Sequence, residues 1–302
     1  MMRPVIFEIP LPHWLLGLLG FEQASGLPIH GYGLMIVIGF LLGTWVAGRE
    51  AKRIGLPDFA YDLGLTMLLC GLLGGRVFYY VENYSEQFRH VSFLEFFKVW
   101  KGGLVFYGGA IGGMMGAFSY LFARKLPVLR SLDILAVGSP LAMAFGRLGC
   151  FMNGCCFGKL CETDFPLGVH FPVDSGAHRA HEMAGLIDAR AVEALAVHPV
   201  QLYQSAHDLL LFVLVWWVMR RSGTPRGVGM PLLFLFYAVG RFCMEGLRAD
   251  NPATPTGLTI SQNVSILLGS VATACVIFLY FKAAKGRGRK VEENTGSGLD
   301  CV

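Results

Sequence analysis

The sequence is poor in charged side chains. Asp, Glu, Lys and Arg make up 15% of the 302 residues, whereas hydrophobic residues make up 54% and the mean hydropathy is +0.53. A soluble domain carries about a quarter charged residues, so this composition excludes an ordinary soluble fold and indicates an integral membrane protein. The net charge is only +4, and no basic stretch is interleaved with aromatic residues. We therefore expect no nucleic-acid partner.

The N-terminus lacks the pattern of a removable signal peptide. Glu8, Pro10 and Pro12 interrupt its apolar stretch, and no small-residue cleavage pattern follows. An internal repeat is also missing from the sequence. Insertion into the membrane is therefore expected to begin at the first true span.

Long apolar runs are what the sequence does contain. About 20 apolar residues are needed to cross roughly 30 Å of hydrocarbon as a helix. We therefore predict an all-α integral membrane fold of about seven transmembrane helices. The predicted spans are residues 31–48, 60–81, 104–122, 132–151, 202–219, 228–247 and 260–281.

The distribution of Lys and Arg predicts the orientation of these spans. Of the 25 basic residues, 14 follow the first, third, fifth and last spans. Basic residues beside spans are retained on the cytoplasmic side, so the N-terminus is predicted outside and the C-terminus inside. The resulting organisation is a helical domain over residues 1–285, with an external insert or lid at 152–200. A disordered cytoplasmic tail is predicted at 286–302.

Three arginines remain inside predicted spans: Arg76, Arg147 and Arg241. Each costs roughly 2.5 to 3.5 kcal/mol at a helix centre, although one near a helix end can extend its charged group to the membrane surface. All three fall in the last third of spans that run outward, so we expect them at one depth in the outer half. Guanidinium groups match phosphate geometry, which predicts a site for an anionic lipid headgroup.

The sixth predicted span carries a polar stripe. Tyr237, Arg241, Glu245 and Arg248 follow one another at spacings of four, four and three residues, which places them on one helical face. A purely structural alternative is that Glu245 only neutralises its two arginines. One positive charge would remain even then.

Two further segments favour a polar site at the outer interface. The fourth span ends in GRLGCFMNGCCFG, whose glycines and Asn153 favour an irregular backbone that can approach a ligand. Irregular backbone at membrane depth is expected to line a cavity. HPVQLYQ then leads into the fifth span, with Pro199 suited to a helix start.

Five ordered motifs extend over nearly the whole chain: GYGLM, GGLVFYGG, GRLGCFMNG, HPVQLY and GRFCMEGLR. Together they closely resemble one bacterial family, the prolipoprotein diacylglyceryl transferases. The resemblance implies a seven-helix, multi-pass enzyme of the bacterial inner membrane whose active site faces the outer leaflet. It implies transfer of the diacylglyceryl group from phosphatidylglycerol to the lipobox cysteine of a preprolipoprotein, with release of glycerol phosphate. We expect a monomer in contact with membrane lipids, and no cofactor or metal.

Site residues follow from the matching motifs, from the arginines inside predicted spans and from the polar stripe. Arg147 resembles the essential arginine of the GRxGxxxNG signature, and with Arg241 it is expected to hold the charge that grows on the departing phosphate. Catalytic roles are predicted for four residues in all, and substrate binding for seven. The first set is Arg147, Arg241, Tyr107 and Glu245; the second is Tyr32, Arg76, Asn153, Gly154, His198, Tyr237 and Arg248.

One departure from the family concerns the proton acceptor. Tyr107 stands where the family usually has a histidine before the double glycine of the third span. A free thiol has a pKa of about 8.5 and tyrosine one of about 10, so we expect Tyr107 to position lipid by hydrogen bonding. Glu245 and His198 are the alternative acceptors, although His198 could instead cap a helix.

A second departure is a group of cysteines beside the signature: Cys150, Cys155, Cys156 and Cys161. The C-x₂-C pairs typical of zinc and iron–sulfur sites are absent, and an oxidising exterior favours disulfides. We expect disulfides or inert thiols, with Cys156 and Cys161 as the first pair to test.

Two other function classes fit the same topology. A transporter or channel for an anionic solute or lipid also has buried arginines and glycine-rich helices, although no inverted repeat supports it. A non-catalytic lipid-binding scaffold would retain phosphatidylglycerol without forming the lipid-modified peptide.

Overall fold

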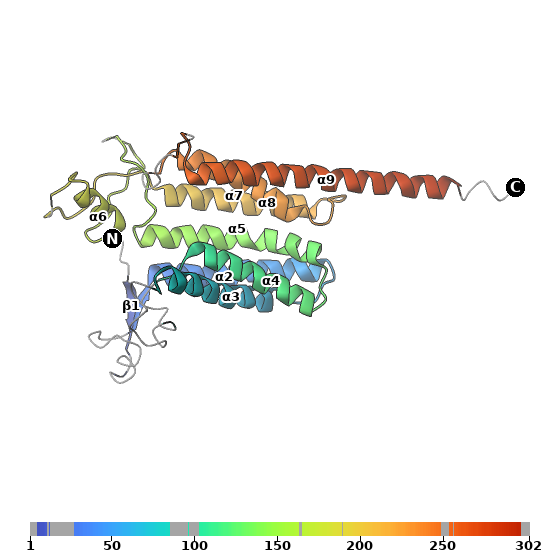
Figure 1. Cartoon of the computed structure of the whole chain (residues 1–302), viewed down its shortest axis with the longest axis horizontal. Helices are drawn as coiled ribbons and strands as arrows, with labels where there is room; N and C mark the ends of the chain where they lie inside the picture. The colour runs from blue at the N-terminus through green and yellow to red at the C-terminus, as the bar shows by residue number, and fades with distance from the viewer. Residues whose placement is uncertain are drawn as a thin grey trace. The chain divides into compact units, whose positions relative to one another are not determined.

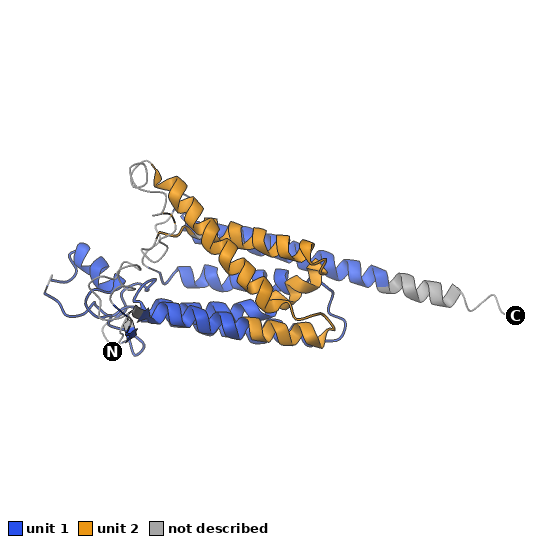
Figure 2. Cartoon of the chain, turned by 90° about the horizontal axis from the view of Figure 1, so that it is seen from below, with its two compact units in different colours: residues 1–43, 136–302 blue, residues 44–135 orange. Residues whose placement is uncertain are grey.

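The computed structural model describes residues 5–10, 12, 27–84, 96, 103–162, 165–188, 190–248, 254–255 and 257–296. The chain forms two compact units (Figure 2). Unit 1 comprises residues 1–43 and 136–302, and unit 2 comprises residues 44–135. The boundaries between them fall within helices α2 (Gly31–Arg53) and α5 (Val128–Met152).

Unit 1 contains the long helices α7, α8 and α9, together with parts of α2 and α5. Helices α7, α8 and α9 lie side by side, with α8 in contact with both of the others (Figure 1). Helices α2 and α5 approach through glycines, because a Cβ atom on Gly39 would lie only 2.9 Å from the carbonyl oxygen of Ala142. The bounds are α6 Gly176–Met183, α7 Val200–Arg220, α8 Gly229–Glu245 and α9 Ile260–Gly296.

Unit 2 is built around the close pair α3 (Ala60–Glu82) and α4 (Phe106–Ala123). Glycines line the seam, so that Gly112 faces the carbonyl of Cys70 and Gly108 faces that of Gly74. Small residues of this kind allow helix backbones to touch. A separate apolar core joins the ends of four helices: Ala47, Ala51, Phe59, Ala60, Leu63, Ala117, Leu121 and Ile134.

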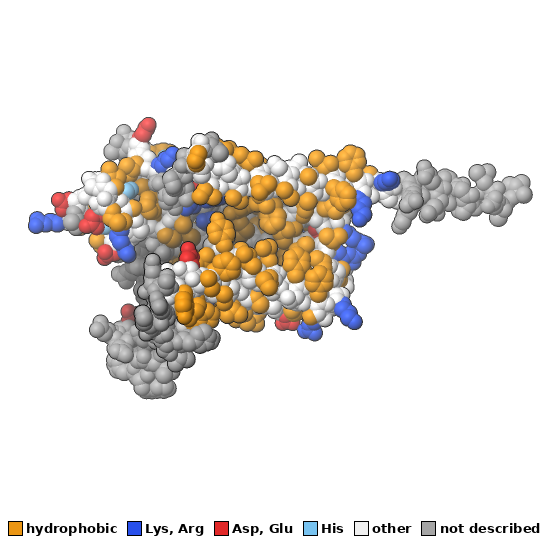
Figure 3. All heavy atoms as spheres, viewed as in Figure 1, with side chains coloured by type: hydrophobic (Ala, Val, Ile, Leu, Met, Phe, Trp, Pro, Cys, Tyr) orange, Lys and Arg blue, Asp and Glu red, His pale blue; other side chains and the backbone are white. Residues whose placement is uncertain are grey.

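The surface of the long helices is apolar. Figure 3 shows hydrophobic side chains over their flanks and Lys and Arg side chains at helix ends. Leu210, Leu267 and Phe281 are among the exposed residues, which suits contact with lipid rather than water. Near two helix ends, Arg49 lies over the ring of Trp45 and Arg221 over that of Trp217, a pairing typical of a membrane interface.

The structure confirms an all-α membrane architecture in its main features. In the described residues, seven helices have 17 or more residues and coincide with the seven predicted stretches. Five of them are long and apolar enough to cross a membrane by length and composition: α2, α3, α5, α7 and α9. The count of seven spans and their orientation stay predictions.

Two features differ from the sequence-based expectation. Strands β1 (Val5–Ile9) and β2 (Leu27–His30) form an antiparallel pair that apolar-run analysis does not detect. Helix α9 continues to Gly296, through much of the segment expected to be disordered from residue 286. Lys, Arg and Glu in that segment are good helix formers, so a helix already started can propagate through it. Residues 297–302 lie outside the described part of the chain.

The predicted insert at 152–200 is a small folded lobe. Phe171, Ala177, Ala194 and Val197 form its buried apolar core. Ser175 caps α6 by accepting a hydrogen bond from the backbone N–H of His178 at 3.1 Å. A short bridge between Gly158 and Arg248 connects the lobe to the end of α8.

Candidate active site

The centre of the site in unit 1 is a buried ion cluster on α8. Arg241 Nη2 lies 2.8 Å from Glu245 Oε2, and Arg248 Nε lies 3.9 Å from the same oxygen. The Glu245 side chain is 0% exposed, and Arg248 and Arg241 are only 7% and 15% exposed. Arg241 and Glu245 lie four residues apart on one face of α8, as the polar stripe predicts, whereas α8 ends at Glu245 and Arg248 approaches from the turn that follows. Two guanidinium groups against one carboxylate leave a net positive charge in a nearly dry place.

The start of α9 completes the cluster. Thr259 donates a hydrogen bond from Oγ1 to Glu245 Oε1 at 2.9 Å, and Arg241 Nη2 donates to Ser261 Oγ at 3.0 Å. Thr259 and Gln262 also form a capping box, since each side chain accepts a hydrogen bond from the other's backbone N–H. The helix cap thus fixes the hydroxyl that holds the carboxylate.

Arg241 has donor capacity left over. Its buried Nη1 atom has no hydrogen-bond partner in the part of the chain that the structure describes. A buried donor without a partner costs about 1 to 3 kcal/mol, and more when it is charged. An anionic ligand oxygen at this atom would remove that cost.

Arg147 adds a second available guanidinium near the end of α5. It is half-buried, and none of the described residues gives it a hydrogen bond or ion pair. Its positive charge acts on Arg241 and on the Tyr32 hydroxyl, so the three side chains share one electrostatic environment. The backbone of Tyr32 at the start of α2 also packs on α5, because a Cβ atom on Gly149 would lie 3.2 Å from its carbonyl oxygen.

The first turns of α7 supply a polar wall. Gln201 is fully buried and donates a hydrogen bond from Nε2 to the carbonyl of Cys155 at 2.7 Å. Its Oε1 atom, the Gln204 Oε1 atom and the Tyr203 hydroxyl are buried without partners among the described residues. Three unpartnered polar atoms within one helical turn indicate a place for water or for polar groups of a ligand.

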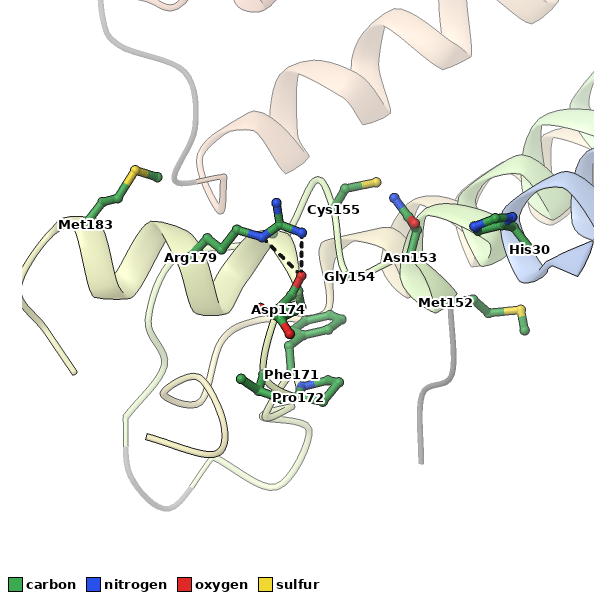
Figure 4. A pocket seen from close by; sticks show the side chains of 13 residues that line it. His30, Met152, Asn153, Gly154, Cys155, Phe171, Pro172, Asp174, Arg179 and Met183 are labelled. Atoms are coloured by element: carbon green, nitrogen blue, oxygen red, sulfur yellow. Dashed lines mark hydrogen bonds between the residues drawn. The ribbon is translucent and has the colours of Figure 1, made fainter. Parts of the chain in front are cut away.

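The irregular backbone predicted after α5 is present. Gly154 has φ of 67°, in the left-handed region that glycine favours, and a Cβ atom there would lie 2.8 Å from Ser175 Cβ. The turn formed by Asn153 and Gly154 lines a cavity of about 580 Å³ between α5 and the insert (Figure 4). In this cavity Arg179 donates two hydrogen bonds to the carbonyl of Asp174, at 3.2 and 2.8 Å.

Tyr237 and His198 have different surroundings. Tyr237 is half-buried one turn before Arg241 and interacts with it electrostatically, as the stripe predicts. The His198 ring packs against Phe165 at a centroid distance of 4.7 Å, while its backbone pairs with Gly158 and Lys159. The alternative that His198 caps the helix is not observed, because the α7 cap residue is Pro199 and no side chain caps it.

Arg76 and Tyr107 belong to unit 2. Arg76 donates a hydrogen bond from Nε to the carbonyl of Phe96 at 2.6 Å and from Nη1 to that of Gly103 at 3.0 Å. Tyr107, at the start of α4, is 65% exposed. The predicted grouping of these two residues with Arg147 and Arg241 stays a prediction, since those arginines belong to unit 1.

The cysteines are arranged differently from the expected pair. Cys156 lies beside Cys150 and Cys155, whereas the sulfur of Cys161 lies near Gly168. All four thiols are free in the structure. Cys156 and Cys161, the first pair to test, therefore do not form a disulfide in the structure, because the turn after α5 directs Cys156 back toward Cys150.

Sequence reasoning missed four polar residues of the site: Gln201, Gln204, Thr259 and Ser261. A signal was present for each pair. The two glutamines lie three residues apart in HPVQLYQ and so share a helical face, and TISQ matches the capping-box pattern.

Comparison with known proteins adds an independent finding. Residues 21–280 match the family model described as prolipoprotein diacylglyceryl transferase. A phosphatidylglycerol–prolipoprotein diacylglyceryl transferase of Geobacillus kaustophilus is 33% identical over 249 residues, which cover 82% of this chain and 87% of the relative. One of Clostridium tetani is 31% identical over 267 residues, covering 88% of this chain and 93% of the relative.

Proposed function

Because this chain belongs to the prolipoprotein diacylglyceryl transferase family, we propose that the arginine cluster of unit 1 binds phosphatidylglycerol for transfer of its diacylglyceryl group. The acceptor is the thiol of the lipobox cysteine of a preprolipoprotein, and the enzyme is a transferase of bacterial lipoprotein biosynthesis. The protein is a multi-pass bacterial inner-membrane protein with its active site toward the outer leaflet, and it works as a monomer.

The reaction exchanges one bond at the glycerol carbon next to the phosphate. The thiol sulfur forms a thioether bond to that carbon while the carbon–oxygen bond to phosphate breaks, and glycerol phosphate leaves. The thiol proton ends on the departing phosphate, which becomes a monoester. The protein's main task is therefore to stabilise the negative charge that grows on the phosphate oxygen.

Arg147 and Arg241 are the groups assigned to that task. The observation that carries the assignment is their unused donor capacity: Arg147 has no polar partner in the described chain, and Arg241 Nη1 is buried without one. Positive charge from Arg248 also acts on Arg241. A phosphate diester would satisfy these donors with charge-assisted hydrogen bonds.

Glu245 is better suited to positioning than to proton transfer. Its carboxylate is already held by Arg241, Arg248 and Thr259, and its side chain is fully buried. Those contacts fix the orientation of both arginines toward the site. We assign Tyr107 a role in positioning the lipid by its hydroxyl, and Asn153 and Gly154 a role in shaping the cavity where the acceptor peptide enters.

The assignment is tested with purified protein, phosphatidylglycerol and a lipobox peptide, with the diacylglyceryl adduct measured by mass. Arg147→Ala should lower the transfer rate about 100- to 1,000-fold, because removing one transition-state donor costs about that much. Arg190→Ala is the matched control, since that arginine is exposed in the insert and does not line the cavity. Undiminished transfer by Arg147→Ala would remove the assigned role.

The wild-type protein distinguishes the rival functions in the same assay. Retention of phosphatidylglycerol without an adduct would indicate a lipid-binding scaffold. Anion flux across vesicles without an adduct would indicate a transporter or channel. Either result would overturn the proposed function.

A further inference from the structure

Three cysteine sulfurs converge where α5 ends. The Sγ atoms of Cys150, Cys155 and Cys156 all lie within 4.8 Å of one another, and the three residues are half-buried. Cys150 lies in the last turn of α5, and the other two follow in the turn that leads into the insert. The backbone N–H of Cys155 donates a hydrogen bond to the carbonyl of Cys150 at 3.2 Å.

The convergence requires two unusual backbone conformations. Gly154 has φ of 67° and Cys156 has φ of 60°, which lies in the left-handed region that a residue with a side chain rarely adopts. Such a conformation costs of order 1 kcal/mol or more. This turn directs the Cys156 side chain back toward Cys150.

We propose that Cys150, Cys155 and Cys156 form a three-thiolate site for one thiophilic d¹⁰ cation, of the class that includes Cu⁺, Zn²⁺ and Cd²⁺. Thiolate ligands lie about 2.3 Å from Zn²⁺, so three ligands around one such ion are about 4 Å apart. That separation is compatible with the three sulfurs, which all lie within 4.8 Å of one another. Soft sulfur ligands select such ions over Mg²⁺ and Ca²⁺.

Two guanidinium groups act on this place. The positive charges of Arg248 and Arg147 both reach the Cys156 sulfur. A cation held by three thiolates carries net negative charge, which these two guanidinium groups balance.

Cys161 provides an internal comparison. It is also half-buried and follows Cys156 by five residues, but it is not a member of the convergent group. Its sulfur lies close to Gly168, because a Cβ atom there would be 2.8 Å away. If metal binding depends on the three convergent thiols and not on the number of cysteines, substitution of Cys161 should not change it.

The test is a Cd²⁺ titration of the reduced full-length protein in detergent, followed by sulfur-to-metal charge-transfer absorbance and by metal content per chain. We expect one Cd²⁺ per chain. Cys150→Ser and Cys155→Ser should each weaken binding by at least about 100-fold, since even outer partners of metal ligands contribute 10- to 100-fold. Cys161→Ser should bind as the wild type does.

Thermal unfolding gives a second readout. Cd²⁺ should raise the Tm of the wild type and of Cys161→Ser, because a ligand that binds the folded state stabilises it, and should leave Cys150→Ser unchanged. Substoichiometric Cd²⁺ binding would overturn the proposal, as would equal losses in Cys161→Ser and Cys150→Ser. A disulfide between two of the three thiols in protein isolated without reductant, detected as a mass lower by two hydrogens, would also overturn it.

Discussion

The two units place arginines inside predicted spans in opposite ways. In unit 2, Arg76 donates to two backbone carbonyls and is 4% exposed, so protein groups account for its charge-bearing donors. In unit 1, Arg241 retains a buried donor without a partner and Arg147 has no polar partner in the described chain. An arginine cannot lose its proton in a protein, so one without partners must find them in a ligand or in water. Whether protein groups satisfy its donors, more than its depth in the membrane, therefore distinguishes a structural arginine from a functional one.

Removal of Arg241 should have the largest effect, because this arginine both forms a buried ion pair and keeps a donor for a ligand. Arg241→Ala should lower lipid transfer about 100- to 1,000-fold. It should also destabilise unit 1, since breaking a buried ion pair costs about 3 to 5 kcal/mol. Transfer is measured by adduct mass and stability by thermal unfolding.

Arg147→Ala is the matched variant that separates the loss of transfer from the loss of stability. It should lose transfer with little change in Tm, because Arg147 has no polar partner in the described chain to leave behind. Equal destabilisation by the two variants would contradict the difference drawn between them.

Arg76→Ala should have an intermediate effect, on stability alone. Two charge-assisted hydrogen bonds are lost, each of which contributes about 1.5 to 3 kcal/mol, so we expect a fall in Tm of roughly 5 °C or more. The KM for phosphatidylglycerol should not change in the protein that remains folded. An increased KM with normal Tm would instead support the substrate-binding role that the sequence predicts for Arg76.

Apolar length and helical spacing explain which parts of the fold were predictable. Each of the seven predicted stretches falls on a long helix, because about 20 apolar residues between charged flanks leave few alternatives to a helix. The strand pair β1–β2 escaped detection because Val5–Ile9 is five residues long, interrupted by Glu8 and followed by Pro10. Its partner lies almost twenty residues away, and no local pattern encodes that pairing.

The site was predictable where its residues lie close together in the sequence. Arg241 and Glu245 pair on one face of α8, and Arg248 follows Glu245 by three residues, so both ion pairs are local. Thr259 was missed because its contact to Glu245 depends on how α9 packs against α8. The cysteine grouping was also missed, since it depends on a left-handed residue at Cys156 that sequence spacing does not reveal.

The smallest expected effect is on the stability of the insert and comes from a buried histidine. This histidine shows a third way in which the protein accommodates a basic side chain. His181 is buried against Phe157, and burial, followed by the nearby His178, lowers its pKa below the usual value of about 6.5. Unlike arginine, it can meet burial by staying neutral. The unfolded chain then binds more protons below pH 6.5, so the insert should lose stability as pH falls through that value, and keep it above.

Amide hydrogen exchange in α6 between pH 5 and 7 measures this loss. His181→Gln should flatten the dependence, and His170→Gln, at an exposed histidine, should leave it as in the wild type. We expect less protection at pH 5 than at pH 7, because the depressed pKa of His181 makes the folded insert bind fewer protons than the unfolded chain. A dependence of the same size in His181→Gln would mean that another group of the insert is titrating. Burial of His181 in its neutral form would then not explain the pH dependence of the insert. The contrast between a basic group that loses its charge and arginines that keep theirs would no longer hold.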